Sequence, residues 1–267
     1  MPAFASLPPP PVLLIACLVA ALLTIAVAAA GAVYFQQLRF KIWQNIALLV
    51  VGVPLLTFAI QAYADYTDGG LGAVLFAVIV LMPLVLTVLT DLRGHQVFYP
   101  LLYLGGIIVM ALDGTVFYYL RDFDREVLSA GWLGALLDGR LRGLTGALLL
   151  GGIFAVLRLV GWLLLRNTRL VEEAAPEDNA IDTVMGSGDT AVGFLIGAAL
   201  GPLWGLVALS LGIFAFGAQA MVVFVVERFR RRPLGSASIP IVPGLALGFV
   251  IVWSFPLLVA SWLVGSV

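Results

Sequence analysis

The chain has 267 residues, of which 62% are apolar and 11% charged, and its formal net charge is −1. A mean hydropathy of +1.11 excludes a soluble domain, which must cover itself with polar side chains, and the near-neutral charge gives no indication of nucleic acid as a partner. The single cysteine, Cys17, excludes an intrachain disulfide and a thiolate zinc site, and the single histidine excludes a multi-histidine metal centre. We therefore expect an all-α, polytopic membrane protein without metal or cofactor.

Apolar runs long enough to cross a membrane recur along the whole chain. A helix needs about 20 apolar residues to cross the hydrocarbon, and this length predicts about eight transmembrane helices. They cover residues 12–35, 46–64, 71–90, 98–120, 144–165, 190–200, 203–226 and 241–264. The sixth run is short, so a start before Thr190 and a tight turn at Gly201-Pro202 both stay open.

Basic residues predict the orientation of these spans. They follow the first, third, fifth and seventh runs, as Arg39 and Lys41, Arg93, Arg166 and Arg169, and Arg228, Arg230, Arg231 and Arg232. Loops rich in Lys and Arg stay in the cytoplasm, so both termini are expected outside. Trp204, near the outer boundary, is expected in an interfacial aromatic belt, whereas Trp253 does not fit a belt and is expected to pack inside.

Two acidic residues lie at the edges of apolar runs. Asp91 directly follows the third run, and Asp189 ends the tetrapeptide Gly186-Ser187-Gly188-Asp189 before the sixth. An ionisable group at such a depth is costly and is a functional hypothesis by default. Two carboxylates at one membrane surface can divide acid and base roles, because neighbouring like charges keep one proton on the pair. The pair therefore suggests an aspartyl protease.

Three ordered segments resemble the type IV prepilin peptidases and preflagellin peptidases. Residues 185–189, followed by 195–201, resemble the family's GxGD motif, Asp91-Leu92-Arg93 resembles its first catalytic aspartate with basic neighbours, and residues 239–248 (IPIVPGLALG) resemble its IPFGPxLALG stretch. The resemblance covers about residues 71–264 and implies that Asp91 and Asp189 are the catalytic pair. It also divides the chain into an N-terminal span with a short cytoplasmic loop, 1–45, and a peptidase-like domain, 46–267, with a cytoplasmic loop at 166–188.

The sequence also departs from the family pattern. Ala191 stands where the family commonly has Lys, and if that departure is tolerated, Ala191→Lys should leave activity equal or higher. Phe98 stands where a Pro usually follows the first aspartate, and the Pro-rich stretch is loosened around Pro240 and Pro243. Larger members carry a domain with paired CxxC motifs that is linked to N-methylation of the product. Residues 36–45 take its place here, so we expect peptidase without methyltransferase activity.

The residues around the two acids suggest supporting roles. Gly186 and Gly188 would let the backbone bend and a substrate strand approach closely, which a Cβ would obstruct. Arg93 and His95 could tune the acids or meet acidic groups of a substrate. Each acid also has a structural interpretation: Asp189 suits a helix N-cap, and Asp91 suits an ordinary interfacial residue. Asp113, within the fourth run, suits a hydrogen-bonding group between helices.

The sequence thus favours a multi-pass aspartyl endopeptidase of a prokaryotic cytoplasmic membrane. It would remove the basic leader of type IV pilin-like precursors, with those precursors and membrane lipids as partners. The oligomeric state stays open. The alternatives are a non-catalytic scaffold of the same fold in pilus or secretion assembly, and a small-solute transporter that uses Asp113 and Asp189.

Overall fold

The structure, a computed structural model, describes residues 71–94, 97, 99–111, 142–167, 187–229 and 240–255, with isolated positions at 18, 21, 22, 25, 57 and 259. Within these residues it has five helices and no strand, which confirms the all-α class for this part of the chain. The helices are α4 (Leu71–Gly94), α5 (Tyr99–Ala111), α8 (Arg142–Asn167), α10 (Ser187–Phe229) and α11 (Val242–Ser254). The first two predicted spans, and the fourth beyond residue 111, lie outside the described helices.

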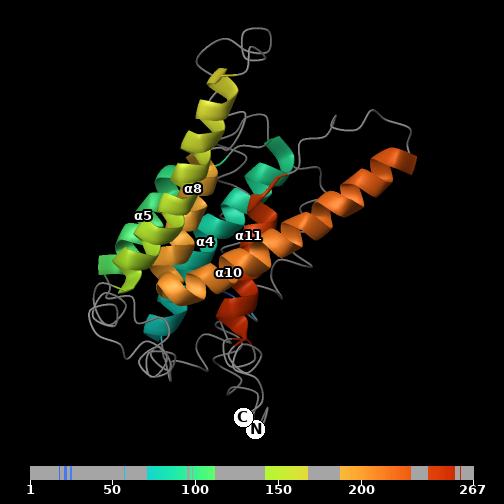
Figure 1. The fold of residues 1–267 in the computed structure, drawn as a ribbon. Helices are drawn as coiled ribbons and strands as arrows, with labels where there is room; N and C mark the ends of the chain where they lie inside the picture. Colours follow the sequence, from blue (N-terminus) through green and yellow to red (C-terminus); the bar gives the residue numbers. More distant parts are fainter. Residues whose placement is uncertain are drawn as a thin grey trace, which may run out of the picture.

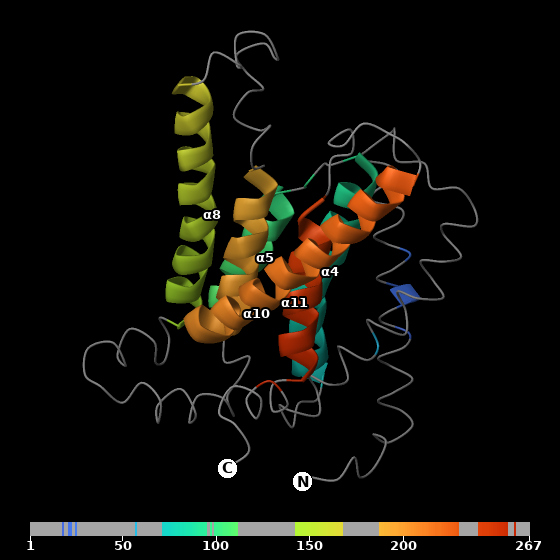
Figure 2. The same cartoon turned by 45° about the vertical axis from the view of Figure 1, so that its right-hand side comes forward.

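Helix α10 consists of two arms that meet at a sharp kink. Gly201 has φ 78° and ψ −179°, a backbone region that is essentially restricted to glycine. The next residue, Pro202, has no N–H to continue the helical hydrogen bonding. The first arm, 187–200, and the second arm, 202–229, diverge from this point (Figure 2). The predicted boundary at Gly201-Pro202 is therefore confirmed, and the sixth run begins at Ser187, before Thr190.

Several helix termini lie toward one end of the bundle, which we call the motif end, although the ends of α8 and of the second arm of α10 are well apart there (Figures 1 and 2). Helix α4, helix α8 and the second arm of α10 end there, at the top of the view in Figure 1, and the first arm of α10 and helix α11 begin there. The kink of α10 and the start of α8 lie at the opposite end (Figure 1). Arg93, Arg166 and Arg228 lie in the last turns of these three helices, so these basic residues are toward the same end of the bundle.

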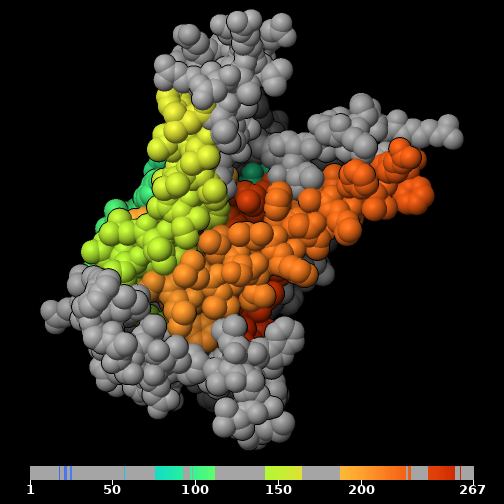
Figure 3. Space-filling view, viewed as in Figure 1, coloured from blue at the N-terminus to red at the C-terminus, as the bar shows by residue number. Residues whose placement is uncertain are grey.

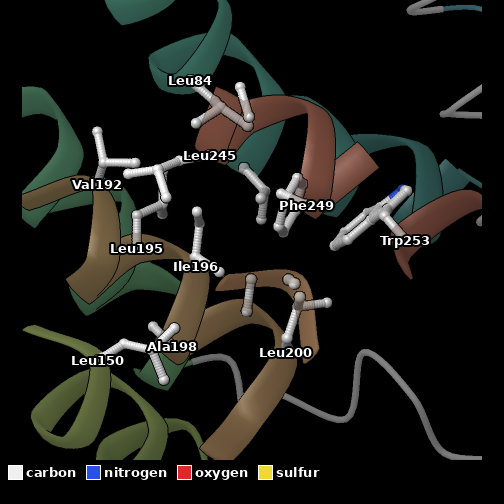
Figure 4. Packing of buried hydrophobic residues seen from close by; sticks show 14 of the residues in the cluster. Leu84, Leu150, Val192, Leu195, Ile196, Ala198, Leu200, Leu245, Phe249 and Trp253 are labelled. Carbon is white, nitrogen blue, oxygen red and sulfur yellow. The ribbon is translucent and has the colours of Figure 1, made fainter. Parts of the chain in front are cut away.

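The core lies where the first arm of α10 meets α4, α5, α8 and α11. Val192, Leu195 and Ile196 point from the first arm toward Leu245 and Phe249 of α11 (Figure 4). Leu84 of α4 and Leu150 of α8 approach the same arm from other sides (Figure 4). All of these side chains are buried, so the first arm of α10, which carries Asp189 in its first turn, is the central helix of the described bundle.

Small residues let the helix backbones approach closely. A Cβ on Gly197 would collide with the backbone of Gly146, and a Cβ on Gly248 would collide with that of Ala208 and Gly212. Close backbone approach through glycine and alanine is typical of helix packing in membranes, where apolar side chains gain little from leaving lipid. These contacts fix α8 and α11 against opposite arms of α10.

Large apolar side chains cover much of the outside. On the second arm Phe214 is 81% exposed, and on α8 Leu148 is 62% exposed; both helices form the outer surface in Figure 3. Two helices of the described residues are long and apolar enough to cross a membrane, over Arg142–Leu163 and Ser187–Val226.

The sequence prediction is confirmed for Trp253 but not for Trp204. Trp253 is completely buried, as expected, and lies against Phe249 and Phe76 with ring centroids 5.1 and 6.4 Å away. The expectation for Trp204 is wrong: its side chain is also completely buried, in the same cluster as Leu200. The kink at Gly201 folds this part of α10 back on the core, so the side chain cannot reach an interface.

Candidate functional site

Asp91 lies in the last turn of α4 and contacts the start of α11. Its side chain is only 6% exposed, and Oδ2 accepts a hydrogen bond of 3.2 Å from the backbone N–H of Val242. An ordinary interfacial residue would keep its carboxylate in water, so that structural interpretation does not fit. Asp91 instead links two of the segments on which the family resemblance rests, residues 91–93 and residues 239–248.

The start of α11 needs a hydrogen-bond acceptor from elsewhere in the chain. Helices leave their first N–H groups without an intrahelical acceptor, and the N-cap residue Ile241 has no side-chain oxygen to accept them. Pro243 has no N–H at all, and the N–H of Leu245 donates to the carbonyl of Ile241. The N–H of Val242 is satisfied by Asp91, which thereby caps α11 from another helix.

Asp189 lies in the first turn of α10 and is 9% exposed. Because the helix begins at Ser187, Asp189 is inside the helix rather than at its N-cap, which shifts the expected capping position. An acid in the first turn is still favoured by the helix dipole, by about 0.3–1 kcal/mol. Helix α10 therefore places Asp189 at the motif end, and the carboxylate in turn stabilises the N-terminus of that helix.

Gly188 is glycine for a reason that the sequence did not show. A Cβ at this position would collide with the side chain of Val97, which lies between α4 and α5. The bare face of Gly188 is therefore occupied by this chain rather than left for a substrate strand, which differs from the expectation. The contact also ties the segment that follows Asp91 to the residue that precedes Asp189.

The structure brings both acids to the motif end at similar depth. A Cβ on Gly105 would lie 3.3 Å from Cγ of Pro83 and 3.4 Å from Cδ1 of Leu195, so these two residues mark one level of the bundle. Asp91 is eight residues beyond Pro83 and Asp189 six before Leu195, which corresponds to about 12 and about 9 Å of helix rise. The two acids lie toward the same end, on neighbouring helices.

The other predicted site residues are placed in part. Pro240 and Pro243 flank the Asp91 contact, and both are half-buried. Gly186, His95 and Asp113 lie outside the described residues, as does the side chain of Arg93. Over the part of the chain that is described, no three His, Cys, Asp or Glu side chains are grouped as metal ligands.

The surroundings of Asp189 alter one expectation. Ala191 is completely buried, so a lysine there would be enclosed by apolar side chains, and we no longer expect Ala191→Lys to be harmless. Thr190, next to Asp189, has a buried hydroxyl without a hydrogen-bond partner in the structure.

Two residues near the acids escaped the sequence interpretation. Val97 gave no signal, since one valine in a loop is unremarkable. Gln219 did give one, because it is the only polar side chain in the run 211–226. Its Nε2 donates to the carbonyl of Pro240 at 3.5 Å, two residues before the N–H that Asp91 accepts.

No protein-family model matches this chain, and the searches of curated proteins and of solved structures find no similar protein. The family resemblance therefore rests on the three segments and on what their residues do in the structure.

Proposed function

We propose that the chain is a membrane aspartyl endopeptidase that removes the basic leader of type IV pilin-like precursors at the cytoplasmic face. Asp91 and Asp189 are the proposed catalytic pair. The observation that carries the proposal is that two buried carboxylates from distant parts of the sequence lie at one end of the bundle, and that one of them bonds to the third segment. Burying carboxylates is costly, which favours a reason beyond packing.

In the proposed reaction the ionised acid takes a proton from water, and the protonated acid donates its proton to the oxygen of the scissile carbonyl. The hydroxide adds to the carbonyl carbon, and the C–N bond then breaks as the leaving amine gains a proton. No cofactor enters this scheme, and without the family's CxxC domain we propose no methyl transfer.

Two observations support a membrane setting, namely the exposed apolar side chains and the positions of the basic residues. Large apolar side chains such as Phe214 and Leu148 are exposed on α10 and α8, and exposed apolar surface is typical of a membrane interaction. We propose about eight spans, with the motif end on the cytoplasmic side, because Arg93, Arg166 and Arg228 lie in the last turns of the helices that end there. Lipids would contact the second arm of α10 and the outer face of α8.

Replacement of each acid by asparagine tests the proposal. Asn is about as good a cap as Asp but lacks the ionisable proton. We expect Asp91→Asn and Asp189→Asn each to keep stability within about 1 kcal/mol, the scale of a cap, and to lose essentially all cleavage of a co-expressed pilin-like precursor. Asp113→Asn is the control and should cleave. Robust cleavage by Asp189→Asn would overturn the assignment.

One observation favours a second candidate, a non-catalytic scaffold of the same fold. Because Asp91 caps α11, its burial has a structural explanation that needs no chemistry. A scaffold would show no cleavage with any pilin-like precursor, yet would retain precursors or assembly proteins in co-purification. No described contact favours the transporter, whose second acid, Asp113, lies outside the described residues.

A further inference from the structure

Gln219 is a polar side chain in an apolar helix. The second arm from residue 211 to 226 is otherwise built from Gly, Ala, Val, Leu, Ile, Met and Phe. A carboxamide in such surroundings is unfavourable unless it is hydrogen-bonded. In the structure its amide nitrogen donates to the carbonyl of Pro240. A carbonyl can only accept, so the amide nitrogen must face it.

The carbonyl of Pro240 belongs to the short segment that leads into α11. It precedes α11, whose own hydrogen bonds begin at the carbonyl of Ile241. Two residues further on, the N–H of Val242 donates to Asp91. The same short segment is therefore held by two hydrogen bonds, one from Gln219 of α10 and one to Asp91 of α4.

We infer that Gln219 is a positioning residue for Asp91. It holds the Pro240–Val242 segment so that the Val242 N–H meets the carboxylate, and this orients Oδ2 at the motif end. Gln219 need not touch a substrate for this role. The catalytic consequence rests on the proposed function, whereas the coupling between Gln219 and the Val242–Asp91 hydrogen bond does not.

Amide hydrogen exchange tests the coupling in the full-length protein in detergent. Pro240 and Pro243 carry no amide hydrogen, so exchange between them reports only Ile241 and Val242. Gln219→Met keeps the length and flexibility of the side chain but removes the donor. We expect the Val242 amide to exchange about threefold faster, a modest effect because a 3.5 Å bond is at the outer limit. Asp91→Ala should raise exchange more, and the double variant no more than Asp91→Ala alone.

Ser210→Ala is the matched control. Ser210 lies on the same arm, and its hydroxyl bonds only within the helix, to the carbonyl of Leu206 at 2.9 Å. Its removal should leave Val242 exchange unchanged. If Gln219→Met fails to fold, Gln219→Asn keeps a carboxamide that is too short to reach and should give the same increase. Wild-type exchange at Val242 in a folded Gln219 variant, or an additive double variant, would overturn the inference.

Cleavage measurements then separate the inference from the proposed function. If wild-type protein cleaves a precursor, Gln219→Met should lower kcat about tenfold with KM unchanged, because orientation of Asp91 matters after binding. A raised KM with unchanged kcat would instead make Gln219 a substrate contact and would overturn the positioning role. If no precursor is cleaved by any variant, the proposed function fails, and the exchange result still decides the coupling.

Discussion

Both arms of α10 are apolar in sequence, yet the first arm is central, whereas the second arm is buried only near the kink and exposed beyond it. In the first arm, Ala191, Ala198 and Ala199 are buried, and Gly193 and Gly197 have no room for a Cβ. In the second arm, Phe214, Met221 and Phe229 are exposed, and Gly217 has open space around it. The comparison teaches that residue size, more than hydropathy, separates a helix that packs among helices from one that faces lipid.

The largest effect is expected when a charge is introduced into the first arm of α10. Ala191→Lys would place an ammonium group where the side chain is completely buried, which we expect to cost about 3 kcal/mol or more. Thermal unfolding in detergent measures the loss. Wild-type stability of this variant would mean that the start of the first arm is more open than described, and would restore the expectation that lysine is harmless there.

One added methyl group on each arm sharpens the comparison. Gly197→Ala would collide with the backbone of Gly146, and overpacking of this kind costs about 1–3 kcal/mol. Gly217→Ala meets nothing within 4 Å and should be neutral or stabilising, since Ala is the better helix former by about 1 kcal/mol. Urea or thermal unfolding of the pair gives the difference. Equal effects would contradict the distinction between the arms.

Two substitutions of Asp91 distinguish the hydrogen bond that caps α11 from the charge of the carboxylate. Asp91→Ala removes the acceptor of the Val242 N–H, and loss of a cap costs about 1 kcal/mol. Asp91→Asn keeps an acceptor oxygen and should cost less. Unfolding free energies of the two variants, compared side by side, measure the contact. If alanine and asparagine are equally stable, the hydrogen bond contributes nothing measurable to the fold.

Leucine substitutions of one exposed and one buried phenylalanine compare the second arm with the core, and the exposed one should show the smallest effect. Phe214→Leu alters an exposed side chain and should stay within about 0.5 kcal/mol of the wild type. Phe249→Leu alters a completely buried one that lies against Trp253, and should cost about 1.5 kcal/mol. Thermal midpoints of both variants make the comparison. A larger loss for Phe214→Leu would indicate that the second arm packs against protein.

The sequence predicted the helical class and several helix positions because those depend on local properties. Apolar runs of sufficient length located α4, α8 and both arms of α10, and glycine followed by proline located the kink at Gly201. The same reasoning predicted that Trp253 packs inside. It misplaced Trp204, because whether a tryptophan meets an interface or a neighbouring helix depends on the direction that the chain takes after the kink.

Tertiary structure alone decided which partners meet. The sequence singled out Asp91 and the Pro-rich segment but gave no reason for them to touch; the contact exists because Ile241 cannot cap α11 and a neighbouring helix brings a carboxylate within 3.2 Å of the Val242 N–H. Likewise, Gly188 in the sequence suggested space for a substrate, whereas Val97 fills that space. Composition and periodicity are properties of single segments, but burial, capping and close backbone approach are properties of pairs, and pairs are set only when the helices pack.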